Sequence, residues 1–291
     1  MKFISVGLFL AVGCATLPSW GQKATKSFYD GFEAQQINGW RVSINAIYDP
    51  AKVEMLTQVE QKKDGAINQS SEHVRAGKFA LKMTVPHQFG NFRSEIARLT
   101  PIPMGSEYWY GFSIYLPSDW QVDSQGNILA QWHSILPRTH REGDGSGKPP
   151  VAITVIGNHW FIRLNWNSSG SGSTGKGARA ASFDLGKIRP GAWVDYVLDA
   201  RWSAGDGGML RLWKDGKMVL NHNGPNEYST NKVGPYFKIG IYHPRWKTIY
   251  KDGLSGDKAV TRAIVVYDDE VRITPAPASY EDVRPRGDKA F

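Results

Sequence analysis

Residues 236–242 read Tyr-Phe-Lys-Ile-Gly-Ile-Tyr, and this stretch decides the fold class. Successive side chains of a β-strand point to opposite faces. The odd-numbered positions are Phe, Ile and Ile, whereas the even-numbered positions are Tyr, Lys, Gly and Tyr. A strand with one apolar and one polar face covers a core on one side only, which is typical of antiparallel sheets.

Similar short runs recur along the chain with turn residues between them. They span residues 79–85, 108–116, 127–136, 151–156, 159–166, 209–213, 218–221 and 263–273. Gly157-Asn158 and Asp215-Gly216 separate two pairs of these runs and predict hairpins. No stretch keeps a helical period over three turns, and only residues 45–58 and 121–126 are candidates for a short helix. The pattern predicts an all-β fold of antiparallel strands, either a two-sheet sandwich or a barrel.

The N-terminus has the features of an export signal. Lys2 is followed by an apolar run over residues 3–12, and Ser19-Trp20-Gly21 has the small-x-small pattern that precedes a cleavage site. We expect residues 1–21 to be a signal peptide and residues 22–291 a single domain, with a core at about 28–274 and a Pro-rich tail. Lipoprotein processing at Cys14 is the less favoured alternative, because the preceding residues lack the usual leucine. Both routes predict a secreted or periplasmic protein.

Charge and composition limit the choice of partner. The chain has 35 Lys and Arg against 27 Asp and Glu, a formal net charge of +8. A basic exported protein suits a polyanion, and no nucleic-acid-binding signature accompanies the charge. Past residue 20 no apolar run is long enough to cross a bilayer. A single cysteine excludes a disulfide scaffold and a Cys-rich zinc site. Acidic polysaccharide and nucleic acid are the two candidate partners, and composition alone does not separate them. Our expectation is an acidic polysaccharide, no nucleic acid, no membrane span and a monomer.

Three predicted strands carry polar side chains two positions apart, and therefore on one face. These pairs are Arg93 and Glu95, Gln131 and His133, and Lys238 and Tyr242. Arginine and glutamine hold carboxylates, whereas histidine and tyrosine move protons. Neither the paired acids of a glycosidase nor a Gly-x-Ser-x-Gly motif is present. The inventory fits proton transfer on an acidic substrate.

These strands resemble those of a known enzyme family. Arg93-Ser94-Glu95-Ile96, Gln131-Trp132-His133 and residues 236–242 resemble the three signature strands of family 7 alginate lyases. Residues 30–33, 77–81 and 267–273 are more similar to glucuronan lyases of polysaccharide lyase family 20 and to heparin lyase I-type enzymes, which share the jelly-roll fold. The resemblance covers about residues 28–274. It implies a β-jelly roll whose concave sheet forms the substrate groove.

The resemblance also implies an activity. A secreted polysaccharide lyase cleaves 1,4-linked polyuronate by β-elimination and leaves a 4,5-unsaturated uronate end. Glucuronan is the first choice of substrate, and a heparin-type glycosaminoglycan or alginate is the alternative. A non-catalytic carbohydrate-binding module on the same sandwich is the alternative from another class.

Two departures from the alginate lyase pattern bear on the site. The first motif is one residue longer, so Arg98 falls on the opposite face from Arg93 unless a bulge intervenes. The third motif continues with His243-Pro244 where alginate lyases have a glutamine near the sugar. This second departure argues against alginate.

Roles follow from the chemistry of elimination. The expected catalytic residues are Arg93, Gln131, His133 and Tyr242, with Arg93 and Gln131 neutralising the substrate carboxylate. The ordinary pKa of tyrosine is about 10, so a base at this position needs a nearby cation, for which Lys238 is available. Whether His133 or Tyr242 is the base depends on the epimer of the uronate and stays open. The expected substrate-binding residues are Lys238, His87, Asn91, Arg245 and Trp246, whereas alternation sends Trp132 inward.

No cofactor is expected for catalysis, but a structural calcium ion is predicted. Many carbohydrate-active jelly rolls hold calcium between their first and last strands. Glu33, a carbonyl near Gly77, and Asp269 resemble such a site, and hard divalent ions prefer oxygen ligands of this kind.

Overall fold

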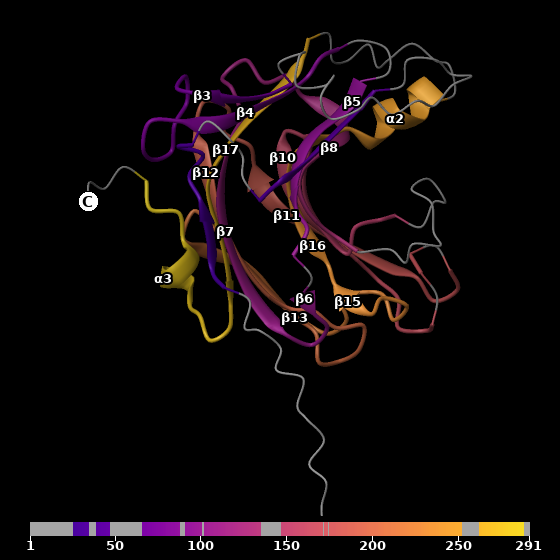
Figure 1. Cartoon of the computed structure of the whole chain (residues 1–291). Coiled ribbons are helices and arrows are strands. Elements are labelled where there is room, and N and C mark those ends of the chain that lie inside the picture. Colours follow the sequence, from indigo (N-terminus) through magenta and orange to yellow (C-terminus); the bar gives the residue numbers. More distant parts are fainter. Residues whose placement is uncertain are drawn as a thin grey trace, which may run out of the picture.

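Two large antiparallel sheets pack face to face in the computed structural model (Figure 1). The structure describes residues 26–34, 39–46, 66–87, 91–100, 102–134, 147–170, 172–173, 175–251 and 262–287. The predicted signal peptide and Cys14 lie outside the described residues, as does most of segment 45–58. Within these ranges no helix is long and apolar enough to span a membrane. The all-β sandwich predicted from the sequence is confirmed.

The first sheet, which we call the outer sheet, has eight strands in the order β14-β13-β12-β7-β17-β4-β3, with β1 also paired to β17. Its strands are β1 (Phe28–Asp30), β3 (Ile67–Ser70), β4 (Ala80–Val85), β7 (Glu107–Tyr115), β12 (Trp193–Arg201), β13 (Met209–Lys214), β14 (Lys217–Asn223) and β17 (Ile264–Pro275). The last strand of the chain therefore lies in the middle of this sheet.

The second sheet has seven strands in the order β11-β10-β9-β8-β16-β5-β2. Its strands are β2 (Arg41–Ala46), β5 (Asn91–Arg98), β8 (Asp123–His133), β9 (Val151–Gly157), β10 (His159–Trp166), β11 (Arg179–Lys187) and β16 (Tyr236–Tyr242). This sheet curves strongly, and its concave face is turned away from the outer sheet (Figure 1). We call it the concave sheet. The remaining elements are β6 (Ile102–Pro103), β15 (Val233–Gly234), α2 (Pro244–Lys251) and α3 (Tyr280–Val283).

An aromatic core fills the space between the sheets. Phe112 of β7 and Phe237 of β16 are fully buried with ring centroids 5.3 Å apart. Trp132 packs against both rings, so the inward orientation predicted for it is confirmed. Burying each phenylalanine contributes about 1.5–3 kcal/mol relative to leaving it in water. These contacts fix which face of β8 and β16 points outward.

Both hairpins predicted from their turn residues are confirmed. β9 and β10 pair across Gly157-Asn158, and β13 and β14 pair across Asp215-Gly216. Asp215 and Gly216 have φ angles of 49° and 78°, the left-handed conformation that this kind of hairpin turn requires. The short helix considered for 121–126 is wrong, because β8 begins at Asp123. A helix forms instead at α2, which begins at Pro244. Proline suits this position, because the N–H of the first helical residue has no partner within the helix and is not needed.

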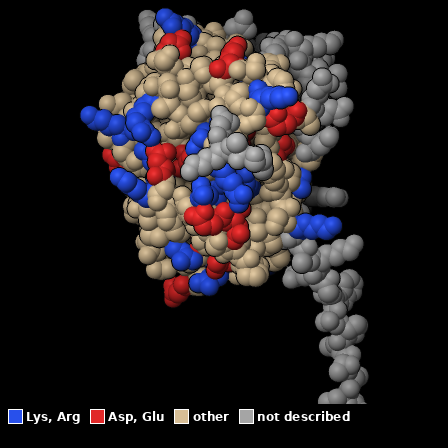
Figure 2. Space-filling view, turned by 90° about the vertical axis from the view of Figure 1, so that its left-hand side faces the viewer, with Lys and Arg blue, Asp and Glu red and all other residues tan. Residues whose placement is uncertain are grey.

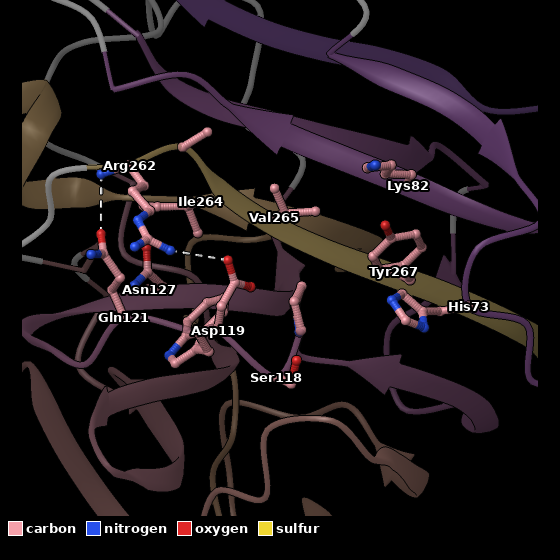
Figure 3. Close-up of a pocket in the computed structure, with 13 residues that line it drawn as sticks. His73, Lys82, Ser118, Asp119, Gln121, Asn127, Arg262, Ile264, Val265 and Tyr267 are labelled. Carbon is pink, nitrogen blue, oxygen red and sulfur yellow. Dashed lines mark hydrogen bonds and ion pairs between the residues drawn. The ribbon is translucent and has the colours of Figure 1, made fainter.

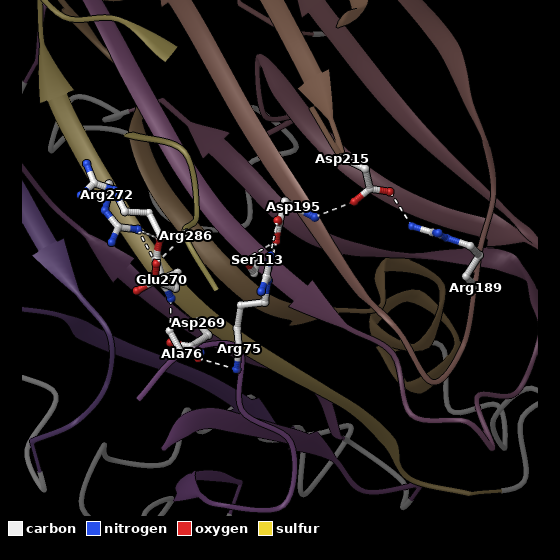
Figure 4. Close-up of polar contacts among 10 residues, drawn as sticks. All are labelled: Arg75, Ala76, Ser113, Arg189, Asp195, Asp215, Asp269, Glu270, Arg272 and Arg286. Atoms are coloured by element: carbon white, nitrogen blue, oxygen red, sulfur yellow. Dashed lines mark hydrogen bonds and ion pairs between the residues drawn. The ribbon is translucent and has the colours of Figure 1, made fainter. Parts of the chain in front are cut away.

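Charged side chains are scattered over the exposed face of the outer sheet. Basic and acidic residues are interspersed on this face instead of forming one basic surface (Figure 2). Arg75 makes two hydrogen bonds to the carboxylate of Asp195, at 2.9 and 2.7 Å, and Ser113 donates to the same carboxylate (Figure 4). The backbone N–H of Arg75 also donates to Asp269 of β17, so residues 75–76 are tied to two strands of the outer sheet.

Candidate active site

Polar side chains from three neighbouring strands meet on the concave face. Pairing of β16 with β5 places Tyr242 beside Arg93 and Gly240 beside Glu95. Pairing of β16 with β8 places Lys238 beside Gln131 and Tyr236 beside His133. The three strands that the sequence singled out are therefore adjacent, in the order β8-β16-β5.

The carboxylate of Glu95 is the centre of this cluster. Its Oε1 accepts a hydrogen bond from Nε2 of Gln131 at 2.5 Å, and its Oε2 accepts one from Nζ of Lys238 at 2.5 Å. Nε of Arg93 lies 3.2 Å from the same Oε2. Glu95 is 1% exposed, so two cations and one carboxylate share a desolvated site. The excess of one positive charge favours an anionic substrate at this point of the sheet.

Arg93 also contacts Tyr242. The guanidinium carbon lies 4.3 Å from the centroid of the tyrosine ring, a cation–π geometry. A positive charge at this distance stabilises negative charge that develops on the phenol oxygen. The sequence assigned this electrostatic role to Lys238. In the structure Lys238 is bound to Glu95, and Arg93 holds the position over the ring.

His133 has one ring nitrogen fixed by the backbone. Its Nδ1 lies 3.1 Å from the carbonyl oxygen of Ser134, and because a carbonyl only accepts, Nδ1 carries the proton. Burial lowers the pKa of His133, and the positive charges of Lys238 and Arg93 lower it further. The ring is therefore neutral near pH 7, and Nε2 is a hydrogen-bond acceptor.

His133 and Tyr242 lie at opposite ends of the cluster. His133 pairs with Tyr236, whereas Tyr242 pairs with Ile128, five positions away along β8. At about 3.3 Å per residue this separates the two backbones by roughly 17 Å. The two side chains do not form a directly bonded pair, so a sugar ring has to lie between them if both act on one bond.

A glycine in β16 allows the strand to bend beside Tyr242. Gly240 has a φ of 120°, and a Cβ atom there would lie 2.3 Å from the carbonyl oxygen of Ser94. The register between β16 and β8 shifts at this point, between Ile239 and Tyr242. The glycine of the third motif is therefore required by the backbone.

The structure separates the other predicted binding residues. Asn91 lies at the start of β5, two positions from Arg93. His87 follows β4 and is not part of β5, the strand of Arg93, and its ring packs against Trp246 with the centroids 5.1 Å apart. Arg245 is exposed in the first turn of α2. Trp246 is fully buried in the core, so the prediction that it lines the rim is wrong. The helix α2 turns it inward, and eight residues are too few to reveal a helical period in the sequence.

Arg98 pairs with Phe237 on the face opposite to Arg93, as expected.

The predicted calcium ligands lie on either side of the segment before β4. Oε1 of Glu33 accepts hydrogen bonds from the N–H groups of Lys78 and Phe79. Oδ2 of Asp269 accepts bonds from the N–H groups of Arg75 and Ala76. Both carboxylates thus anchor backbone, and among the described residues no three acidic, histidine or cysteine side chains cluster as a metal site. A calcium ion held partly by carbonyl oxygens stays a prediction.

The sequence alone does not reveal the role of two acidic residues in this region. Glu95 was visible beside Arg93, but its contact with Lys238 depends on a partner 143 positions away. Glu227 is fully buried next to Ser134, whose hydroxyl donates to its Oε1 at 3.2 Å, and Nδ2 of Asn231 donates to the same oxygen at 2.6 Å. It supports the residue whose carbonyl fixes the ring of His133.

Comparison with solved structures finds one that supports the fold assignment, with a TM-score above 0.5. A crystal structure of endo-β-1,4-glucuronan lyase from the fungus Trichoderma reesei matches with a TM-score of 0.68 and 24% identity, covering 90% of this chain and 100% of that chain. Alginate lyase A1-II′, a member of polysaccharide lyase family 7, matches with a TM-score of 0.49 and 13% identity, covering 81% of this chain and 94% of that chain. A search of curated protein sequences finds no match.

A family comparison gives the class of the protein. The profile of the family described as "Polysaccharide lyase" matches residues 24–272. That range includes every strand of both sheets except the last residues of β17, and all the polar residues of the concave face. The chain belongs to this family, and it is a polysaccharide lyase.

Proposed function

We propose that this protein is an exported lyase that cleaves glucuronan, a 1,4-linked polymer of glucuronate, by β-elimination. The main observation in support is the cluster on the concave face, where Arg93 contacts both Glu95 and the ring of Tyr242. A site with excess positive charge suits a uronate carboxylate. The likeness to a glucuronan lyase over the whole of that chain supports glucuronan as first choice.

In the proposed reaction a base removes the proton on C5, next to the carboxylate. The electrons form the C4=C5 double bond, the C4–O4 bond breaks, and a proton is delivered to O4. Removal of the C5 proton builds negative charge on the carboxylate, so preplaced donors lower the barrier. Arg93 supplies this charge stabilisation, and Gln131 completes the cluster through Glu95.

For glucuronate, the C5 proton and O4 lie on the same side of the ring. One residue can then act as base and acid, and we assign both roles to Tyr242 because Arg93 lies over its ring. The role of His133 in this scheme is to accept a hydrogen bond at Nε2 from a sugar hydroxyl, because its Nδ1 proton is held by Ser134.

The position of His133 favours a second candidate. A neutral imidazole at the far end of the cluster from Tyr242 suits a base and an acid on opposite sides of the sugar. That arrangement fits the epimeric uronate, found in alginate and in heparin-type glycosaminoglycans. The two candidates differ in substrate and not in the class of reaction.

One assay tests the proposal and separates the candidates. The protein is incubated with glucuronan, alginate, heparin and, as a control polyanion, DNA, and the ultraviolet absorbance of the C4=C5 bond is followed. We expect product from glucuronan, and Tyr242→Phe should lower turnover by at least about two orders of magnitude. Binding without product would leave a non-catalytic binding module as the function. Export is tested by the mass of the mature protein, which should lack residues 1–21.

A further inference from the structure

A pocket of about 400 Å³ is lined mainly by the outer sheet and its loops, and its lining includes no residue of the cluster on the concave face (Figure 3). Lys82 of β4 and Tyr267 of β17 pair side by side and line it. Their chain neighbours Leu81 and Val266 lie in the core, so Lys82 and Tyr267 point to the outside of the sandwich. Residues 117–121, which follow β7, form another wall.

Aromatic rings form part of the lining. The ring of His73 stacks on Tyr115 at 4.2 Å and meets the ring of Tyr267 edge-on at 4.9 Å. Trp120 lines the pocket next to Asp119. Rings with a few polar groups between them are the usual lining of a site for a small organic ligand.

Two buried polar atoms of this lining have no hydrogen-bond partner among the described residues. One is the donor Nε1 of Trp120, and the other is the acceptor Oδ1 of Asn127, a residue that is 1% exposed. Leaving such atoms unpaired costs about 1–3 kcal/mol each. A hydroxyl group both accepts and donates, so a ligand rich in hydroxyls can satisfy an indole N–H and an amide oxygen in one pocket.

Arg262 is the charged group of the lining that suits an acidic ligand. The other cation, Lys82, is paired with Glu72 at 2.6 Å, and Asp119 contributes one carboxylate. Arg262 lies 3.3 Å from Asp119, and both side chains are about two-thirds exposed. Such an exposed pair contributes only about 0–1 kcal/mol, so the guanidinium can turn to a ligand carboxylate at little cost.

We propose that this pocket is a second, non-catalytic binding site that holds one uronate unit of the polysaccharide. Hydroxyl groups contact Trp120 and Asn127, and the carboxylate contacts Arg262. The site retains the polymer while another part of the chain occupies the concave face. The identity of the polymer rests on the proposed function, whereas the presence of a second sugar site does not.

Calorimetry on the inactive Tyr242→Phe variant tests the proposal with a glucuronate trisaccharide as the probe. We expect two binding sites per chain. Adding Arg262→Gln and Trp120→Phe should remove one of them, and Arg262→Gln alone should weaken it about tenfold, a loss of about 1.4 kcal/mol. Arg189→Gln is the matched control, because Arg189 lies in the loop before β12, is 61% exposed and pairs with Asp215 at 2.6 Å. This control should leave both sites intact.

Two results would overturn the proposal. One is a single site that survives the Arg262 and Trp120 substitutions, and the other is equal binding of cellotriose, which has the same linkage but no carboxylate. Activity gives an independent readout: in the enzyme with Tyr242 intact, Arg262→Gln should raise KM for the polymer and leave kcat for the trisaccharide unchanged. Failure of the proposed function appears differently, as an absence of unsaturated product from glucuronan with both sites still binding.

Discussion

Nε2 of His243 lies 2.6 Å from Oδ2 of Asp123, both side chains are fully buried, and His243 is the residue that follows Tyr242. Nδ1 of His243 accepts a hydrogen bond from the backbone N–H of Trp246, so Nε2 carries the proton and donates it to Asp123. The pair links the end of β16 to the start of β8 and to the first turn of α2. It fixes the backbone that presents Tyr242.

Removing Asp123 should therefore reduce both stability and turnover. Asp123→Ala leaves the N–H of His243 buried without an acceptor, which costs about 1–3 kcal/mol and about 2–4 °C in Tm for each kcal/mol in a domain of this size. Thermal melts and kcat measure the two effects. Asp184→Ala is the control, because it breaks a more exposed histidine–aspartate pair of 2.8 Å, and it should change Tm by little. Equal losses in the two variants would contradict a positioning role for the buried pair.

Acid should weaken the same pair. Burial pushes the pKa of Asp123 upward, but the hydrogen bonds from His243 and from the backbone of Gln125 outweigh it and hold the pKa below its ordinary value. A carboxyl with a lowered pKa stabilises the fold above its ordinary value of about 3.9, and this contribution is lost as pH falls through the lowered value. The pH dependence of Tm below pH 4 should be shallower in Asp123→Asn than in the wild type.

Glu95→Gln tests the centre of the cluster. The substitution leaves Lys238 and Arg93 without their shared counter-charge, and breaking a buried ion pair costs about 3–5 kcal/mol. We expect a lower free energy of unfolding by denaturant and a loss of turnover of about two orders of magnitude. Glu95→Gln combined with Lys238→Met should recover most of the stability but none of the turnover. Full activity in the single variant would exclude Glu95 from a functional role.

The pH profile of kcat reports on His133. Burial and the charges of Lys238 and Arg93 lower the pKa of His133, so its neutral form persists to lower pH than in an ordinary histidine. Both roles considered for it need the neutral ring, and turnover should fall only on the acid side. Lys238→Met removes a nearby positive charge and should move this acid limb to higher pH. A limb that stays in place or moves to lower pH would exclude His133 as the titrating group.

Glu227 should make stability fall as pH rises. Burial raises the pKa of Glu227 to about 7, although three hydrogen bonds to Oε1 oppose the shift. A group with a raised pKa contributes stability below its unfolded value of about 4.3, and that contribution is lost as pH rises to about 7. At 1.36 kcal/mol per unit the loss is about 4 kcal/mol. Glu227→Gln should be more stable than the wild type at pH 8 and similar at pH 4, as measured by urea unfolding at the two pH values.

Calcium should stabilise the protein if Glu33 and Asp269 hold it. A ligand that binds only the folded state raises Tm, so melts with calcium and with a chelator should differ, and Asp269→Ala should abolish the difference. Asp269→Ala also removes the acceptor for Arg75 and Ala76, and its Tm in chelator should be lower than that of the wild type. Identical melts of the wild type after thorough chelation would leave both acids as anchors of the segment before β4.

The sequence could predict those features that depend on near neighbours. The strand at 236–242 has the predicted bounds, and Asp215-Gly216 forms the predicted turn. β12 was missed because Asp195 and Asp199 disfavour a strand, and their compensation comes from distant arginines, Arg75 and Arg211. The role of Glu95 was missed for the same reason. Sequence alternation shows which face a side chain takes, but pairing between strands decides which charges it meets.

The place of β17 in the outer sheet has a consequence for how the chain folds. β17 pairs with β1, β4 and β7, and residues 264–275 lie between β4 and β7, two strands that come roughly 150 to 190 positions earlier in the chain. The outer sheet stays open until synthesis has passed residue 275, and its contacts have high sequence separation, which slows folding. A partly synthesised chain therefore exposes the unpaired edges of β4 and β7, and truncation before residue 264 should give an aggregating product instead of a smaller folded unit.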